Sequence, residues 1–257
     1  FFIISLSNNL EKMENLFKMY EVGGKVRDEI LGLESKDVDY VAVPNDKLLQ
    51  DFDTAESMFS MLEQYLRDEK FDIKVIKADC FTIRAIFPNN HKYSGVADVV
   101  MARKEIGYIP GTRTPIVKPG TLYDDLERRD FTLNALAKDE DGTIIDYFEG
   151  LKDLEAGRLV TPLETKKTFD DDPLRILRAV RFSITKGFRM GYIMDDIQEY
   201  DYESKMGVVS TERIREELLK CFKYDTLKTL EILDNIPTLK RYIFKNNLLW
   251  LKPTMEQ

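Results

Sequence analysis

The stretch DVDYVAV, residues 37–43, places two aspartates two positions apart inside an apolar run. On a strand, residues i and i+2 point to the same face, so Asp37 and Asp39 would hold their carboxylates side by side. Like charges repel, and apolar surroundings make them costly, so a cation is expected between them. Carboxylate oxygens are the ligands that Mg²⁺ prefers. The pair therefore predicts a magnesium site.

A third acid, Asp98, stands in another β-branched run, GVADVVMAR. If the two strands are neighbours, three carboxylates could converge on two metal ions that activate an attacking hydroxyl and stabilise a leaving oxygen in nucleotidyl transfer. Gly23 and Gly24 precede them at a strand-turn-helix, where bare backbone N–H groups can approach a triphosphate. A solvated turn or a DxD-type glycosyltransferase site would carry the same aspartate spacing. An EF-hand is excluded, because no third acid, glycine and closing glutamate follow.

Composition narrows the functional classes. A chain of 257 residues with 43% hydrophobic residues can form one large domain or two small ones. The net charge of −8 argues against a broad nucleic-acid-coating surface but leaves room for a local basic groove. The single histidine, His91, excludes a multi-histidine zinc site and is expected in a solvated loop. Cys80 and Cys221 are far apart and are expected to be reduced packing residues of a cytoplasmic protein.

The elements that position these residues form an α/β head followed by a helical region. Hydrophobic periodicity predicts strands at 18–22, 37–43, 71–77, 80–87 and 96–103, with a short helix over 25–33 that Gly32 closes. A helix is predicted over 45–71, capped by Asn45 or Asp46. From about Thr168 the pattern turns helical, with segments at 171–188, 210–223 and 226–251. The expected fold class is α+β, a mixed sheet with helices followed by an all-helical neck.

The first residues, FFIISL, are apolar but too short for a membrane span or a signal segment. Met13 would be a natural start, so residues 1–12 are expected to be upstream or fragment sequence, or a short packing extension. No membrane partner is expected.

The motif GGKVRD…KDVDY resembles the first motif of the class II tRNA nucleotidyltransferases (CCA-adding enzymes) and of the related bacterial poly(A) polymerases, both polymerase β-like nucleotidyltransferases. The resemblance continues in order through RRDFTLNALA, DYFEGLKDLEAGRLVTPL, DDPLRILRAVRF and STERIREELLK, from Tyr20 to about Lys220. Five ordered motifs make chance similarity negligible. The resemblance implies a head at 13–150, a helical neck with a base-reading motif at 151–224, and a short helical remnant at 225–257.

The resemblance also implies roles for single residues. Asp37 and Asp39 are the metal ligands of a two-Mg²⁺ site, and Asp98 takes the place of a third catalytic acid. Asp130 would accept a hydrogen bond from a ribose 2′-OH, and a surface ion pair with its neighbour Arg129 is the alternative. The residues expected to contact the nucleotide in the head are Gly23, Gly24, Arg27, Arg129, Asp130 and Asn134.

In the family, the counterpart of DDPLR reads the base of the incoming nucleotide. Asp172 would accept from the amino groups of cytosine and adenine, and Arg175 would donate to their ring nitrogens, whereas guanine and uracil present the opposite pattern. Three residues apart, the two are expected to be neighbours on a helix, where a plain salt bridge is the alternative. Asp171 stands where many relatives carry glutamate. Arg178 and Arg181 are expected to contact the nucleotide or primer phosphates, and Glu212, Arg213 and Glu217 to form a structural ion-pair network.

The function expected from the resemblance is template-independent addition of CCA to tRNA 3′ ends from CTP and ATP, with release of pyrophosphate. Poly(A) synthesis, partial CC- or A-addition, and a non-catalytic RNA-binding relic are the alternatives. The partners implied are the tRNA 3′ end, CTP and ATP, and a homodimer is left open. A cytoplasmic location is expected, with an organellar or phage-encoded origin not excluded. About 37 residues follow Lys220, so most of the body and tail of longer family members is absent from this sequence.

Overall fold

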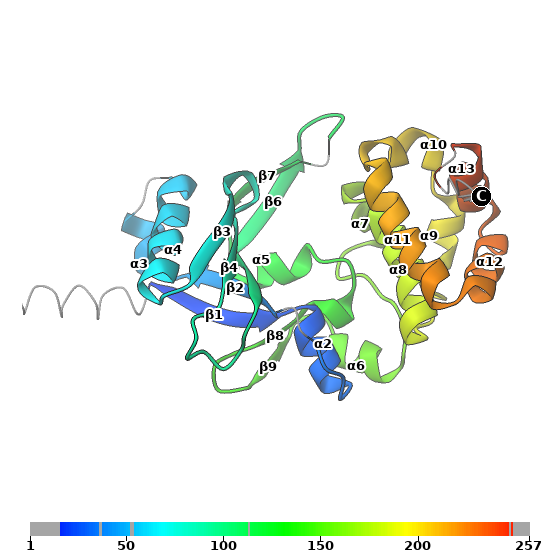
Figure 1. Ribbon diagram of the computed structural model, residues 1–257. Coiled ribbons are helices and arrows are strands. Elements are labelled where there is room, and N and C mark those ends of the chain that lie inside the picture. Colours follow the sequence, from blue (N-terminus) through cyan, green and yellow to red (C-terminus); the bar gives the residue numbers. More distant parts are fainter. Residues whose placement is uncertain (1–15, 36–37, 52–53, 113, 247, 249–257) are drawn as a thin grey trace, which may run out of the picture. The chain divides into compact units, whose positions relative to one another are not determined.

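The structure is a computed structural model that describes residues 16–35, 38–51, 54–112, 114–246 and 248. It divides into two compact units, one taking in most of the chain up to Leu151 and the other the chain from Lys152. The first unit is a mixed sheet with helices and the second is helical, which confirms the expected α+β class (Figure 1).

Within the described residues, the first unit contains a sheet of seven strands in the order β3-β4-β5-β2-β1-β8-β9. β2 and β5 are parallel, and every other neighbouring pair in this sheet is antiparallel. A separate hairpin, β6–β7, was not predicted from the sequence. The strands are β1 (Phe17–Val22), β2 (Val38–Pro44), β3 (Asp72–Lys77), β4 (Thr82–Ile86), β5 (Val96–Met101), β6 (Arg103–Tyr108), β7 (Pro115–Pro119), β8 (Leu136–Lys138) and β9 (Ile144–Asp146).

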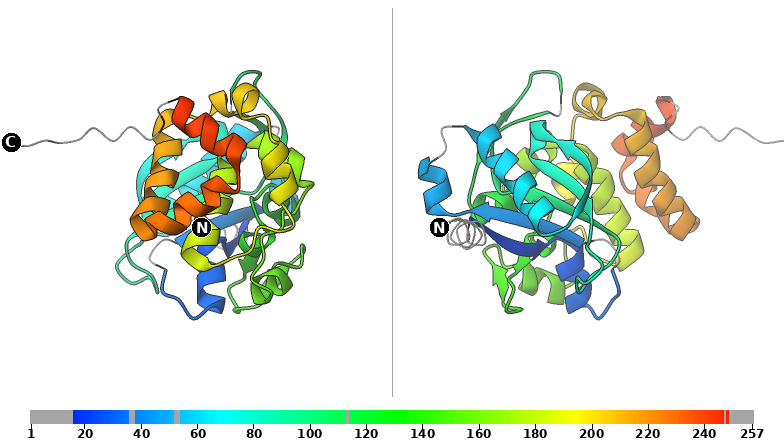
Figure 2. Two further views of the ribbon diagram at one scale, coloured as in Figure 1. Left: turned by 90° about the vertical axis from the view of Figure 1, so that its right-hand side faces the viewer. Right: turned by 60° about the vertical axis from the view of Figure 1, so that its left-hand side comes forward.

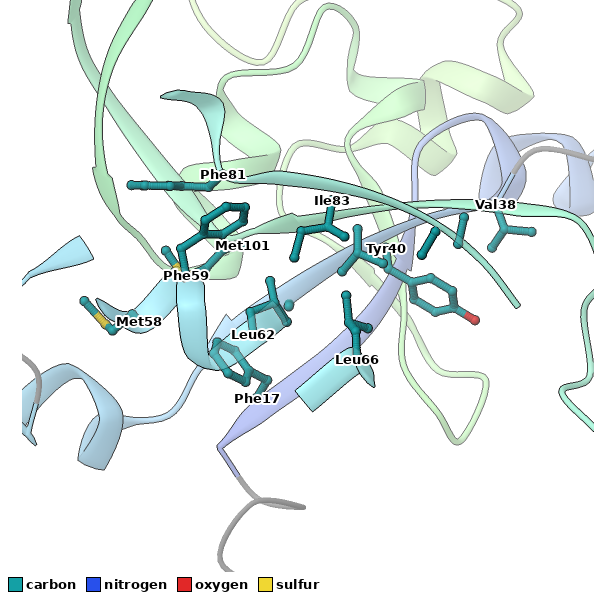
Figure 3. Packing of buried hydrophobic residues seen from close by; sticks show 14 of the residues in the cluster. Phe17, Val38, Tyr40, Met58, Phe59, Leu62, Leu66, Phe81, Ile83 and Met101 are labelled. Atoms are coloured by element: carbon teal, nitrogen blue, oxygen red, sulfur yellow. The ribbon is translucent and has the colours of Figure 1, made fainter. Parts of the chain in front are cut away.

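One face of the sheet carries the larger core of this unit. Helix α4 (Ala55–Asp68) places an apolar side against alternate residues of β2, β4 and β5. Figure 3 shows Leu62 of this helix facing Ile83 of the sheet, and both side chains are fully buried. Because side chains alternate along a strand, the residues between these core positions point to the opposite face.

The opposite face is covered only in part. Helix α5 (Leu122–Glu127) packs Leu122 and Leu126 against Val22 and Val41 of the central strands. Farther along the sheet, on β4 and β3, the same face carries exposed side chains such as Arg84 and Lys77. On this face, β1 and β2 are therefore covered by α5, whereas β4 and β3 present an open polar surface.

The predicted helix over 45–71 consists of two helices, α3 (Asp46–Asp51) and α4. The Asn45 Oδ1 atom accepts from the Leu48 N–H at 2.7 Å and caps the first. Thr54 caps the second by accepting from the Ser57 N–H at 3.1 Å. The prediction of a single helix was wrong, because the periodic apolar pattern contains a second capping residue, Thr54, that begins a new helix. The remaining helical elements of this unit are α2 (Gly24–Ile30), η1 (Ala78–Cys80) and η2 (Thr132–Asn134), and α6 (Gly150–Glu155) spans the boundary between the units.

The second unit packs its helices around a core that includes Phe169, Ile176 and Leu218. Helices α8 and α11 lie against each other and make the largest helix pairing of the described chain (Figure 2). A proline begins α13, which explains why the predicted helical stretch over 226–251 is divided. The helices are α7 (Thr165–Asp171), α8 (Leu174–Lys186), α9 (Met194–Glu199), α10 (Tyr202–Lys205), η3 (Met206–Val208), α11 (Thr211–Tyr224), α12 (Thr226–Asp234) and α13 (Pro237–Lys245).

Three expectations about single residues can be compared with this fold. His91 is half-buried and stacks on Phe87 at 4.5 Å between ring centroids, so it is a packing residue rather than a freely solvated one. Burial lowers its pKa. Cys221 is buried and Cys80 half-buried, and both are free thiols, as expected. No helix in the described ranges is both long and apolar enough to span a bilayer.

Candidate nucleotidyltransferase site

Two of the three predicted carboxylates lie directly opposite each other. Asp39 on β2 is in register with Asp98 on the parallel strand β5, and both belong to the face away from α4. Neighbouring strands are only about 4.8 Å apart, so a cation is needed between or beside the two charges. Asp37 lies outside the described residues, and its role stays a prediction. Within the described ranges, no three acidic, histidine or cysteine side chains gather as a metal-binding group.

The cation beside Asp98 is Arg84, a residue that the sequence analysis did not single out. Arg84 lies on β4 in register with Asp98, and its Nε and Nη2 atoms donate to the two carboxylate oxygens at 2.7 and 2.6 Å. The Arg84 side chain is 56% exposed, so the pair contributes about 0–1 kcal/mol. The two residues meet through strand register, which no local sequence pattern reports.

Gly23 brings the backbone close to this carboxylate row. It follows β1 with a φ of 70°, a conformation that glycine adopts readily. A Cβ atom built on Gly23 would lie 2.9 Å from the Arg129 Nη1 atom and 3.8 Å from the Asp39 Oδ2 atom. The Arg129 Nε atom is buried with no hydrogen-bond partner in the described part of the chain. An anionic oxygen beside Arg129 would satisfy this donor.

Three other predicted nucleotide contacts form one buried network. The Arg27 Nη1 atom donates to the Asn134 Oδ1 atom at 2.5 Å, and the Asn134 Nδ2 atom donates to the Asp130 Oδ1 atom at 2.9 Å. Asp130 also accepts from the Phe131 N–H at 2.8 Å. Asn134 lies on a 3-10 turn, η2, rather than on an α-helix. The network joins helix α2, which begins at Gly24, to the RRDFTLN motif 107 positions away in sequence.

A fully buried carboxylate, Asp125 on α5, orients the arginines of this motif. Its Oδ1 atom accepts from the Arg128 Nη2 atom at 2.6 Å, and its Oδ2 atom accepts from the Arg129 Nη2 atom at 3.0 Å. Burial alone would raise the pKa of Asp125, but Arg128 and Arg129 outweigh burial and hold it below its usual value. Spacings of three and four residues on a helix are a recognisable signal, so the sequence contained a clue to this anchor.

The DDPLR motif of the second unit, which was expected to read the base, has a different geometry from the one predicted. Asp172 does not share a helix with Arg175, because it lies between α7 and α8, and Pro173 precedes the first residue of α8. The Asp172 Oδ1 atom caps α8 by accepting from the Leu174 N–H at 3.1 Å. The Arg175 Nη1 atom donates to the Thr168 carbonyl at 3.1 Å, which holds this side chain against α7.

The later arginines of α8 differ from each other. The Arg181 guanidinium stacks over the Phe182 ring at 4.4 Å, and its Nε atom donates to the buried Glu217 of α11 at 2.5 Å. Arg178 also lies over Phe182, at 5.5 Å. This ion pair joins α8 to α11 through Glu217 and directs Arg181 to α11. Arg213, expected to be structural, approaches Asp172 to 4.0 Å.

These features define a nucleotidyltransferase head. Residues 19–160 match the family model described as the Poly A polymerase head domain. The chain belongs to this family, which confirms the resemblance read from the sequence.

Named relatives agree with this assignment. The chain is 35% identical over 209 residues to the "Multifunctional CCA protein" of Nitrosomonas eutropha, an alignment that spans 78% of this chain and 43% of the relative. It is 31% identical over 215 residues to the "CCA-adding enzyme" of Leuconostoc mesenteroides, covering 82% of this chain and 47% of that protein. The chain therefore spans about half the length of these relatives.

Solved structures show the same fold. The Thermotoga maritima CCA-adding enzyme complexed with tRNA_CCA is 26% identical with a TM-score of 0.66, and the match covers 98% of this chain and 54% of that chain. A complex of a CCA-adding enzyme with CTP gives a TM-score of 0.67 at 26% identity over the same shares of each chain.

We expect Asp125→Asn to lower the free energy of unfolding at pH 7 by up to about 3–5 kcal/mol, because two half-buried guanidiniums lose their shared, fully buried carboxylate. The depressed pKa of Asp125 means that its contribution is present above the unfolded-state pKa of about 3.9 and is lost as pH falls through the folded-state value. The difference between variant and wild type should therefore shrink below about pH 4. Urea unfolding at several pH values measures this.

Glu127→Gln removes a charge from the same helix, outside this cluster, and should change the unfolding free energy by less than about 0.5 kcal/mol. Equal effects of the two substitutions at pH 7 would contradict the role of Asp125 as the anchor of Arg128 and Arg129.

Proposed function

We propose that this chain is a template-independent RNA nucleotidyltransferase that adds CCA to tRNA 3′ ends from CTP and ATP. The observation that carries the proposal is the row of Asp39 and Asp98 on neighbouring strands, beside Gly23 and Arg129. The family membership supports the reaction class, and the printed names of the relatives support CCA addition.

The residues of the row fit a divalent cation. Asp39 and Asp98 present carboxylate oxygens on one face of the sheet, and Asp37 is proposed as a further ligand on the strength of its spacing. Mg²⁺ bound there would favour the ionised form of the attacking hydroxyl and offset the charge that develops on the leaving oxygen. The exposed partner of Asp98, Arg84, can exchange without a large penalty, because such a pair contributes little.

The nucleotide end of the site belongs to the Gly23 side of the row. We propose that Arg129 and Arg27 contact phosphate oxygens, with Gly23 and Gly24 allowing the close approach of the triphosphate. Arg27 is oriented by Asn134 and Asp28, and Arg129 by Asp125, so these guanidiniums are largely preorganised. We propose that Asp130, which accepts from the Phe131 N–H and the Asn134 Nδ2 atom, also accepts from a ribose 2′-OH.

In the proposed reaction the 3′-hydroxyl oxygen of an RNA end bonds to the α-phosphorus of CTP or ATP. The bond to the β-phosphate oxygen breaks, and pyrophosphate leaves. Asp172 and Arg175 select the base, the first as the acceptor and the second as the donor. We also propose the division into a head at 13–150, a neck at 151–224 and a remnant at 225–257, with Arg178 facing nucleotide or primer. A cytoplasmic location and a homodimer rest on the resemblance alone.

Poly(A) synthesis is the second candidate, because the matching family model is described by that activity. Transcripts of tRNA that lack CCA, lack only the final A, or are complete separate the two when one labelled nucleotide is supplied at a time with Mg²⁺. We expect addition of C, C and A followed by arrest. Runs of A on any RNA would favour poly(A) synthesis, and no incorporation with Mg²⁺ or Mn²⁺ would support a relic.

We expect Asp39→Asn to reduce this incorporation by about 1,000-fold or more, because a lost metal ligand removes several kcal/mol of transition-state stabilisation. Asp72→Asn, at an exposed position on the same sheet, is the matched control and should retain activity. Comparable activity of Asp39→Asn and Asp72→Asn would contradict the proposed site.

Gly23 and Gly32 offer a matched pair for the phosphate contact, since their φ values are 70° and 69°. Alanine at either position should cost about 1–3 kcal/mol of stability through backbone strain, towards the upper end at Gly23, whose ψ of −132° lies outside the left-handed helical region. Only at Gly23 would the new Cβ crowd Arg129, because nothing lies within 4 Å of the Gly32 position. Gly23→Ala should therefore weaken CTP binding about 10- to 100-fold. Equilibrium dialysis with labelled CTP checks this, and an equal loss in Gly32→Ala would refute the contact.

Asp172→Asn keeps an oxygen that can cap α8 but replaces an acceptor with an amide that can also donate. We expect the preference for CTP over UTP to fall about tenfold or more, since one lost base contact is worth about 1–3 kcal/mol. The control is Asp201→Asn, which changes another helix-capping aspartate of the same unit. Kinetics with CTP and UTP measure the ratio, and unchanged discrimination in Asp172→Asn would count against base reading.

A further inference from the structure

The open part of the sheet contains a hollow that the nucleotide end of the site does not use. It encloses about 200 Å³ and is lined by Val75, Lys77, Thr82, Arg84 and Asp98. Four residues are in register across β3, β4, β5 and β2, in that order: Val75, Arg84, Asp98 and Asp39. Lys77 of β3 pairs with Thr82 of β4 two residues farther along these strands. The hollow is therefore an extension of the carboxylate row, on the side away from β1 and Gly23.

The charge of this hollow is unusual for an acidic chain. The chain carries a net charge of −8, yet two of the five lining residues are cationic and the one acid, Asp98, is paired with Arg84. Both Arg84 and Lys77 are exposed. A guanidinium and an ammonium that share a solvent-accessible hollow favour an anionic ligand with oxygens on its surface.

The geometry of phosphoryl transfer indicates which anion would bind in this hollow. The attacking and leaving oxygens lie roughly in line on opposite sides of the transferred phosphorus. The triphosphate is placed on the Gly23 and Arg129 side of Asp39, so the attacking 3′-hydroxyl should approach from the β5–β4 side. Arg84 lies two strands from Asp39, which is about 10 Å at ordinary strand spacing. The RNA backbone that leads to the attacking 3′-hydroxyl would pass at this distance from Asp39.

We propose that Lys77 and Arg84 bind backbone phosphates of the RNA segment that ends in the attacking 3′-hydroxyl. This inference rests on the proposed function, because it places the RNA relative to the proposed triphosphate site. Arg84 contacts phosphate through its planar fork, and its exposed pairing with Asp98 is weak enough to be exchanged. Lys77 contributes a point charge.

Lys77→Ala tests the proposal most cleanly, because it leaves the Arg84–Asp98 pair in place. Binding of a tRNA transcript lacking CCA is measured by fluorescence anisotropy in EDTA, between 50 and 200 mM salt. We expect a three- to tenfold loss of affinity, with the slope of log K against log[salt] reduced by about 0.7 for one single-strand phosphate contact. Arg84→Ala should act similarly and the double variant roughly additively. CTP affinity should not change.

Lys74→Ala is the matched control, since Lys74 is an exposed lysine on the same strand that pairs with Asp72. It should bind RNA as the wild type does. Wild-type RNA affinity and salt slope in both Lys77→Ala and Arg84→Ala would overturn the inference, as would a wild type that binds no RNA. A parallel loss of CTP affinity would also overturn it and assign the hollow to the triphosphate.

These outcomes are separable from the proposed function. RNA binding that depends on Lys77 in a chain that incorporates no nucleotide would contradict the function and leave the hollow as an RNA site. Incorporation by the wild type with unaltered RNA binding in both Lys77→Ala and Arg84→Ala would contradict the inference alone.

Discussion

The repulsion between carboxylates on adjacent strands is the constraint on which the rest of this site depends. Asp39 and Asp98 are in register on parallel strands. The backbone hydrogen bonds between these strands therefore keep the two carboxylates close to each other. A cation must accompany such a pair. The exposed Arg84 guanidinium is a weakly bound cation of this kind. A weakly bound cation suits the proposed site, where Mg²⁺ would replace it.

The arginines proposed to contact the triphosphate are held in the opposite way. Asp125 is fully buried and holds Arg128 and Arg129, while Asn134 and Asp28 hold Arg27. Buried pairs of this kind are strong positioning devices, because removing one partner leaves an uncompensated charge. The head thus combines an exposed, weak ion pair at the carboxylate row with more buried, stronger pairs around the arginines proposed to contact phosphate.

The parts of the fold that could be predicted from the sequence are those that local residue patterns determine. The β-branched run after Asp37 is β2, the Gly-Gly turn precedes α2, and the run around Asp98 is β5. The parts it did not predict depend on pairing between distant segments. Arg84 meets Asp98 only because β4 and β5 are antiparallel in one register. Asp172 leaves the helix of Arg175 because proline disfavours helical geometry in the residue before it.

That last difference changes the geometry of the motif that is proposed to read the base. On one helix, Asp172 and Arg175 would be flexible surface neighbours free to pair with each other. As a helix cap, Asp172 has one oxygen fixed by the Leu174 N–H, and Arg175 is fixed by the Thr168 carbonyl. Each side chain is thereby held by backbone atoms. A protein that selects a base without a template needs such fixed donors and acceptors, because mobile ones would adapt to the wrong base as readily as to the right one.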